Sequence, residues 1–226
     1  MNRLALFDCD GTLVDSQASI VRAMNACFEE HGLIPPDRSA TRRIVGLSLP
    51  EAMRVLVPEG EAGLHDALTA SYKAAFFQHR EAGLVEEPLF DGIAEALEAL
   101  ECAGWLLGVA TGKSDRGLRF CLEHHGLHAR FVTLQTADRH PSKPHPAMLQ
   151  AAIAEAGATP ETTVMIGDTS FDMMMAVAGG AHALGVGWGY HGPDELRAAG
   201  AQNVVDSAPA LIEHLQTFQP GCRLDD

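Results

Sequence analysis

Basic residues are scarce in this chain, and their scarcity excludes one large class of partners. Sixteen lysines and arginines stand against 30 aspartates and glutamates among 226 residues, which gives a formal net charge of −14. A protein that binds nucleic acid needs a basic face to meet the phosphates. We therefore expect no nucleic-acid partner. An anionic substrate would need local positive charge that overrides the acidic surroundings.

Cysteines are few, and long apolar runs are missing. The cysteine count is odd and contains no Cys-x-x-Cys pair, so we expect neither a disulfide framework nor a zinc knuckle. No apolar run approaches the roughly 20 residues that span a bilayer, and no charged segment followed by an apolar one opens the chain. We expect a cytoplasmic protein with no membrane partner. The cysteines are Cys9, Cys27, Cys102, Cys121 and Cys222.

What the chain does contain is an alternation of short apolar runs and helical patterns. Such an alternation indicates a parallel sheet covered on both faces, so the predicted fold class is α/β, with a three-layer Rossmann-like core. The predicted strands are Leu4–Phe7, Trp105–Ala110, Val164–Ile166, Ala183–Val186 and Asn203–Val205. The predicted helices of this part are Ile93–Ala103, Ser114–His124, Pro146–Ala156, Phe171–Ala178 and Ala208–Gln216.

The stretch 15–86 breaks the alternation. It has helical patterns over Gln17–His31, from Ser48 toward Leu56, and over Leu64–Gln78, and it contains no strand pattern. A purely helical stretch inserted after the first strand predicts a separate small domain. We therefore expect a core made of residues 1–14 and 87–226, and an inserted all-helical domain made of residues 15–86.

Two aspartates follow the first predicted strand. Side chains alternate along a strand, so Asp8 and Asp10 leave its end on the same side and close together. Two carboxylates that close repel each other unless a cation or a shared proton separates them. Mg²⁺ prefers oxygen ligands and is the expected cation. Asp8 is a candidate nucleophile for phosphoryl transfer, and Asp10 is its candidate acid–base partner.

Groups that suit an anion lie at the same edge of the predicted sheet. Thr111 and Gly112 end the second strong strand and offer a hydroxyl and backbone N–H groups at a helix start. Lys143 lies in a proline-stiffened loop, where it supplies a fixed point charge suited to phosphate oxygens. Each signal alone has a simpler interpretation. Thr111 would cap the helix that follows it, and Lys143 and the neighbouring Lys113 would be solvated side chains.

A second acidic pair follows the strand Val164–Ile166. Asp168 is placed to be a further Mg²⁺ ligand, and Asp172, one helical turn on, could hold Lys143 or a metal-bound water. The carboxylates need a cation, and the hydroxyl, the N–H groups and the lysine need an anion. A Mg²⁺–phosphate pair meets both needs, at the edge where open parallel sheets bind ligands.

These segments resemble the four motifs of the haloacid dehalogenase superfamily. The likeness spans nearly the whole chain, and the helical insert resembles the α-helical cap of that family. Within that superfamily, the chain resembles the phosphoglycolate phosphatase-like group, which has a sequence similar to Gly187–Tyr190 after the fourth motif. The motif segments are Asp8–Ser16, Ala110–Lys113, Ser142–Pro144 and Gly167–Asp172.

The resemblance implies a Mg²⁺-dependent phosphatase that hydrolyses a small phosphorylated metabolite through an aspartyl-phosphate. It implies that Asp8 is nucleophile and metal ligand, that Asp10 is acid–base catalyst with its backbone carbonyl on the metal, and that Asp168 completes the protein ligands. True dehalogenases of the family lack an aspartate at the position of Asp10, so we do not expect dehalogenation. The groups implied to bind the phosphoryl group are Thr111, the Gly112 N–H and Lys143.

Substrate choice would lie with the cap. The segment Thr41–Ser48 is expected to face the site, and Arg42 or Arg43 would then bind a substrate carboxylate in bidentate fashion. A small phosphorylated acid such as phosphoglycolate would fit that arrangement. Three alternatives stay open from the sequence: a phosphomutase resembling β-phosphoglucomutase, an inorganic pyrophosphatase, and a phospho-acceptor switch domain that regulates a partner.

Overall fold

A six-stranded, wholly parallel sheet organises the larger part of the molecule in this computed structural model, which describes residues 1–220. Cys222 lies outside the described residues. The strand order is β3-β2-β1-β4-β5-β6, so β1 is central and lies between β2 and β4. The strands are β1 (Arg3–Phe7), β2 (Trp105–Thr111), β3 (Phe131–Thr136), β4 (Thr163–Gly167), β5 (His182–Val186) and β6 (Asn203–Val205).

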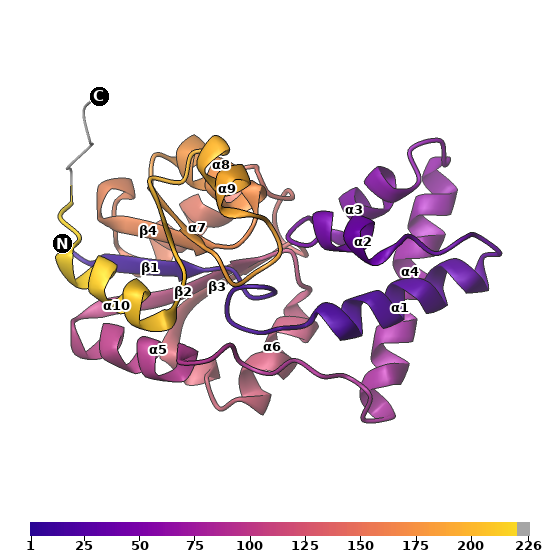
Figure 1. Ribbon diagram of the computed structural model, residues 1–226, viewed down its shortest axis with the longest axis horizontal. Coiled ribbons are helices and arrows are strands. Elements are labelled where there is room, and N and C mark those ends of the chain that lie inside the picture. The colour runs from indigo at the N-terminus through magenta and orange to yellow at the C-terminus, as the bar shows by residue number, and fades with distance from the viewer. Residues whose placement is uncertain (221–226) are drawn as a thin grey trace.

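Both faces of the sheet are buried, as the runs of apolar residues predicted. Along β1, Ala5 and Phe7 belong to one hydrophobic cluster and Leu4 and Leu6 to the other. Figure 1 shows helices on both sides of the sheet, and the three-layer α/β core is confirmed. One face packs against α5 (Ile93–Cys102), α6 (Asp115–His124) and α10 (Ala208–Thr217). The other packs against α7 (Ala147–Ala156), α8 (Ser170–Gly179) and α9 (Pro193–Ala198).

The strand β3 was not among the predicted elements. It is an edge strand that pairs only with β2, and its sequence mixes apolar residues with threonines and a glutamine. Thr133 and Gln135 are buried, because Glu155 on α7 accepts hydrogen bonds from both side chains. The sequence of β3 is locally polar and so does not predict a buried strand. The hydrogen bonds to Glu155 are what make the burial of its polar side chains possible.

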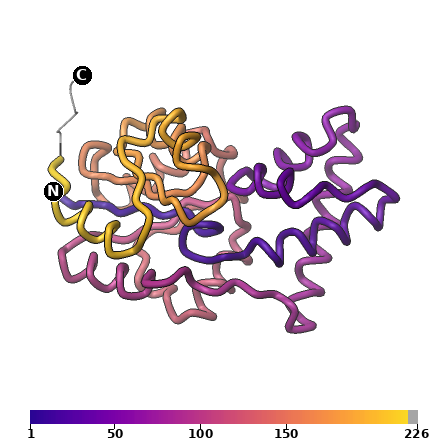
Figure 2. Tube along the Cα trace, viewed as in Figure 1, coloured from indigo at the N-terminus to yellow at the C-terminus, as the bar shows by residue number. Residues whose placement is uncertain are grey.

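A helical cap is inserted after β1. Its helices are α1 (Gln17–Glu30), α2 (Arg38–Arg43), α3 (Leu49–Leu56) and α4 (Ala62–Glu81). They enclose a small core of their own, which includes Met24, Met53 and Leu68. The chain passes between core and cap twice (Figure 2), and the two crossings run side by side, because the Asp15 N–H donates to the Pro88 carbonyl at 2.8 Å. The domain boundaries at residues 15 and 86 stay a prediction.

Among the helices within residues 1–220, none is long and apolar enough to cross a bilayer.

Candidate active site

The carboxyl edge of the sheet collects side chains from three adjacent strands. Asp8 directly follows β1, Thr111 ends β2, and Asp168 directly follows β4. All three residues are buried. Because the strands are parallel and neighbours, their carboxyl ends meet at one edge. The structure thus brings together residues that are far apart in the sequence.

Lys143 reaches this edge from the loop between β3 and α7. Its Nζ lies 2.9 Å from Oδ1 of Asp8 and 2.6 Å from Oδ1 of Asp172, and all three side chains are buried. Burial by itself lowers the pKa of Lys143, but the two carboxylates more than offset this and raise it. The other Asp172 oxygen accepts hydrogen bonds from the Thr169 N–H and hydroxyl. Asp172 therefore fixes a charged lysine beside Asp8.

Asp8 has one carboxylate oxygen that is held and one that has no partner. Oδ1 accepts a hydrogen bond from the Cys9 N–H at 2.6 Å and pairs with Lys143. Oδ2 is buried and has no hydrogen-bond partner among the described residues. Burial raises the pKa of Asp8 to about 7, although Lys143 acts in the opposite direction. An unsatisfied buried oxygen is costly, so this atom is suited to a cation or a reacting group.

Asp168 is held on both of its oxygens. Oδ1 accepts from the Thr12 hydroxyl at 2.8 Å, and Oδ2 accepts from the Tyr190 N–H at 2.9 Å. Burial, followed by the nearby carboxylates of Asp8 and Asp172, raises the pKa of Asp168 well above its usual range. A positive ion beside these groups would reverse that effect and let all of them ionise.

The buried carboxylates form a cluster that fits Mg²⁺. One oxygen each from Asp8, Asp168 and Asp172 lies within 4.8 Å of the others. An all-oxygen donor set suits this hard cation, and the partnerless oxygen of Asp8 is available as a ligand. Glycines let the chain pass close to the cluster, because a Cβ at Gly11 or at Gly189 would come within 2.2 Å of an Asp168 atom.

The carboxylate of Asp10 is not part of this cluster. Oδ1 of Asp10 accepts hydrogen bonds from the Ser16 hydroxyl and from the Lys113 ammonium. Lys113 also pairs with Glu87 at 2.8 Å. The side chain of Asp10 instead lines the cavity between core and cap. The expected contact of Asp10 with a metal concerns its backbone carbonyl, and that contact stays a prediction.

Lys113 is a site residue that the sequence did not single out. Its side chain is only 10% exposed, although a solvated lysine was the simple interpretation. Burial lowers the pKa of Lys113, but the carboxylates of Asp10 and Glu87 more than offset this and raise it well above the usual value. Glu87 also pairs with Arg80 of the cap at 2.9 Å. A chain of opposite charges therefore connects the cap to Asp10.

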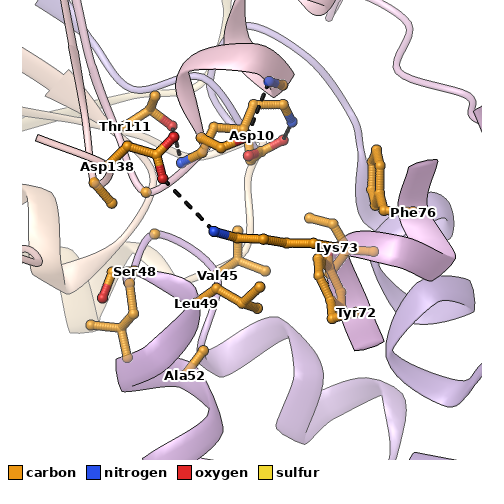
Figure 3. A pocket seen from close by; sticks show the side chains of 18 of the residues that line it. Asp10, Val45, Ser48, Leu49, Ala52, Tyr72, Lys73, Phe76, Thr111 and Asp138 are labelled. Carbon is orange, nitrogen blue, oxygen red and sulfur yellow. Dashed lines mark hydrogen bonds and ion pairs between the residues drawn. The ribbon is translucent and has the colours of Figure 1, made fainter. Parts of the chain in front are cut away.

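A cavity of about 570 Å³ lies between the sheet edge and the cap. Figure 3 shows Asp10 and Thr111 on its core side, and Lys73 reaching from α4 toward Asp138, with 3.9 Å between Nζ and Oδ1. Gly112 lies where the cap touches the core, since a Cβ there would meet the Leu47 carbonyl at 2.4 Å. The cavity therefore lies between the candidate catalytic groups of the sheet edge and a wall that the cap supplies.

A family model described as haloacid dehalogenase-like hydrolase matches residues 5–186. The chain belongs to this family. The resemblance found in the four sequence motifs is thereby confirmed.

Relatives of this haloacid dehalogenase-like chain include proteins named as phosphatases. The "Probable phosphatase IndB" of Dickeya dadantii is 39% identical over 217 residues, 94% of this chain and 93% of that protein. A phosphoglycolate phosphatase of Xylella fastidiosa is 33% identical over 213 residues, 93% and 91% of the two chains. The crystal structure of a predicted phosphatase from Clostridium acetobutylicum has a TM-score of 0.86 at 24% identity, covering 96% and 100%, and shows the shared fold.

The two cap arginines, Arg42 and Arg43, contact the core, and their expected role with a substrate carboxylate stays a prediction. Neither lines the cavity that holds Asp10, but Arg43 lies at a second hollow between cap and core that also includes Lys143. Arg42 donates hydrogen bonds to the carbonyls of Gly189 and Tyr190 at 3.2 Å each, and Arg43 lies 3.9 Å from Glu195. Arg42 therefore connects the cap to the core, whereas the exposed Arg43 pair at the same interface contributes little. The segment that follows them, residues 44–48, does line the cavity.

Proposed function

We propose that this haloacid dehalogenase-like hydrolase is a Mg²⁺-dependent phosphatase that releases phosphate from a small phosphorylated metabolite through an aspartyl-phosphate on Asp8. Its family and its phosphatase relatives make it an enzyme that acts on phosphoric monoesters. The observation that carries the proposal is the buried, partnerless Oδ2 of Asp8 beside the charged Lys143, at the floor of a cavity.

In the first step a carboxylate oxygen of Asp8 attacks phosphorus, and the bond from phosphorus to the alcohol oxygen breaks. Asp10 donates a proton to that leaving oxygen, so the alcohol departs neutral. Lys143, the Thr111 hydroxyl and the Gly112 N–H bind the phosphoryl oxygens and offset their charge. General acid help of this kind contributes roughly 10²–10⁴-fold to the rate.

In the second step Asp10, now ionised, takes a proton from a water molecule, and the resulting oxygen attacks phosphorus. The bond from phosphorus to the Asp8 oxygen breaks, so inorganic phosphate leaves and the Asp8 carboxylate is restored. Lys113 and Ser16 keep the Asp10 carboxylate at the cavity wall through both steps. Bound Mg²⁺, held by Asp8, Asp168 and the Asp10 backbone carbonyl, would supply positive charge opposite the phosphate.

The test is a phosphate-release assay on a panel of phosphomonoesters, with added Mg²⁺ or with EDTA. Wild type is expected to turn over only with the metal. Asp8→Asn removes the nucleophile but keeps the shape of the side chain, and should lose at least ~10³-fold in kcat. Asp66→Asn makes the same chemical change at an exposed cap position and serves as the matched control.

Other outcomes would replace the proposal. Full activity in Asp8→Asn would contradict the aspartyl-phosphate intermediate, and undiminished turnover in EDTA would contradict the requirement for the metal. Isomerised hexose phosphate without net phosphate release would point to a mutase, and selective cleavage of pyrophosphate to a pyrophosphatase. A stable phosphorylated Asp8 without repeated turnover would indicate a switch domain.

A further inference from the structure

The cavity extends well beyond the groups proposed to bind phosphate, and this part has no assigned role. Its volume of about 570 Å³ falls within the roughly 300–1,000 Å³ that is usual for pockets holding drug-sized ligands. A two-carbon phosphorylated acid would leave most of that space to water. The inference below rests on the proposed function, because it concerns the alcohol part of the same substrate.

One side of the cavity is an alternating stack of rings and guanidinium groups. We call it the aromatic wall, and it consists of Phe76, Phe77 and Arg80 of α4 together with Arg116 and Phe120 of α6. The Arg116 guanidinium lies 4.2 Å from the Phe77 ring centroid and 5.5 Å from that of Phe120. The Arg80 guanidinium lies 5.4 Å and 5.0 Å from the ring centroids of Phe76 and Phe120.

The aromatic wall is partly open to a ligand. Phe120 is 42% exposed, although it is a large apolar side chain. Phe76 and Phe77 are half-buried, and Figure 3 shows Phe76 and Tyr72 side by side on α4 at the cavity. Rings left facing a cavity offer stacking surface to a flat group, and guanidinium planes stack on such groups as well.

The charges of the cavity do not favour a small acid. Arg80 and Lys113 are both paired with Glu87, and Lys73 lies 3.9 Å from Asp138. Among the described cations that line the cavity, Arg116 is the one without a carboxylate partner, and its side chain is exposed. A substrate carboxylate would therefore find only Arg116 unpaired there, and the guanidinium of Arg116 already stacks on Phe77.

We propose that the alcohol part of the substrate carries a planar ring that stacks on the aromatic wall while its phosphate reaches Asp8. The wall is built from both domains, because α4 belongs to the cap and α6 to the core. A ring bound there would contact both at once, and would favour the arrangement in which the cavity is covered. Planarity is the property that the stack selects, beyond apolar size alone.

Three esters with comparable primary alcohols separate these properties: ethyl, cyclohexylethyl and phenethyl phosphate. Burial of a ring should raise kcat/KM for phenethyl phosphate ~10-fold or more above that for ethyl phosphate. Stacking should add a further preference for phenethyl over cyclohexylethyl phosphate of about twofold to tenfold. Phosphoglycolate is assayed beside them as the small acid.

The variants test whether the aromatic wall causes the preference. Phe77→Leu and Phe120→Leu keep apolar bulk and should bring the phenethyl to cyclohexylethyl ratio close to one. Arg116→Gln should lower the same ratio. Arg119→Gln is the matched control, because Arg119 lies on the same helix, pairs with Glu123 at 3.8 Å and does not line the cavity. It should keep the wild-type ratio.

A binding measurement keeps this inference separate from the proposed function. Phenethylphosphonate and ethylphosphonate cannot be hydrolysed, and their affinities are measured by calorimetry with Mg²⁺ present. The ring-bearing compound should bind ~10-fold or more tightly. Equal affinities, or higher kcat/KM for phosphoglycolate than for phenethyl phosphate, would overturn the planar-ring assignment and leave the phosphatase intact. Tight ring-dependent binding without any ester hydrolysis would support the assignment and overturn the phosphatase.

Discussion

The buried ion pairs at the edge of the sheet contrast with the exposed pair that Lys73 of the cap forms with Asp138. At the edge, Asp8, Lys143 and Asp172 are buried and bonded to one another. On the cap side, Lys73 has an exposed side chain and lies 3.9 Å from its partner. Buried charges are strongly coupled to the fold, whereas exposed pairs contribute little. The candidate catalytic groups therefore contribute to the stability of the core, whereas a change of the exposed cap pair should alter stability little.

The largest effect is expected when the same change, lysine to methionine, is made at the edge of the sheet and on the cap. Lys143→Met removes the only cation that contacts Asp8 and Asp172 among the described residues. Breaking a buried pair costs about 3–5 kcal/mol, which lowers Tm by on the order of 10 °C in a chain of this size. Lys73→Met should cost less than about 1 kcal/mol. Thermal unfolding in EDTA measures both.

The same pair of variants sharpens the contrast in activity. Lys143→Met should also lower kcat/KM by about 10²–10³-fold, because it removes a fixed charge from the phosphoryl group. Lys73→Met should stay near wild type with ethyl phosphate, because the exposed Lys73 pairs with Asp138 and not with the carboxylates proposed to act on the phosphate. Similar losses of Tm in the two variants would show that burial does not separate the two regions.

A smaller effect is expected from backbone packing, again compared between the two regions. Gly189→Ala places a Cβ 2.2 Å from the Cβ of Asp168. Overpacking of this kind costs about 1–3 kcal/mol, and displacing Asp168 should lower activity up to ~10²-fold. Gly63→Ala in the exposed first turn of α4 meets no atom within 4 Å and should stabilise the protein by about 0.5–1 kcal/mol. Denaturant unfolding with a parallel phosphatase assay checks both expectations.

The contrast also explains what the sequence could predict. Asp8 and Asp168 directly follow short apolar strands, and parallel strands bring their carboxyl ends to one edge, so local patterns were enough to place them. Lys113 was taken for a solvated residue because its partner Glu87 comes from the second crossing between cap and core. A contact of that kind depends on the domain arrangement, which residue spacing does not encode.

The cap was harder to predict for a different reason. Apolar periodicity shows that a helix face is covered, but it does not distinguish a face covered by other helices from one that lines a cavity. Phe76 and Phe77 were therefore unremarkable in the sequence, whereas Arg42 attracted a role by its charge. In the structure Arg42 donates to core carbonyls, and the phenylalanines line the cavity.

The smallest effect is expected at the opposite edge of the same sheet, where a half-buried polar group has no opposite charge beside it. His182 begins β5 and faces His214 of α10, with 3.4 Å between their Nε2 atoms. The Phe218 ring packs against it at 5.2 Å. Burial, and then His214, lowers the pKa of His182 from its usual 6.5 to about 4. The folded protein therefore favours the neutral form of the His182 side chain.

A depressed histidine pKa means that the unfolded chain binds the proton first. The stability that depends on neutral His182 is complete above about pH 6.5 and is lost as pH falls from there toward 4. His182→Gln should reduce the fall in Tm between pH 7 and pH 5 by about 2–4 °C, equivalent to roughly 1 kcal/mol. The exposed His124→Gln should leave that fall as in wild type. If His182→Gln leaves that fall unchanged as well, the acid sensitivity comes from other groups with a lowered pKa, such as His191 or His214, and His182 does not make the two ends of the sheet differ.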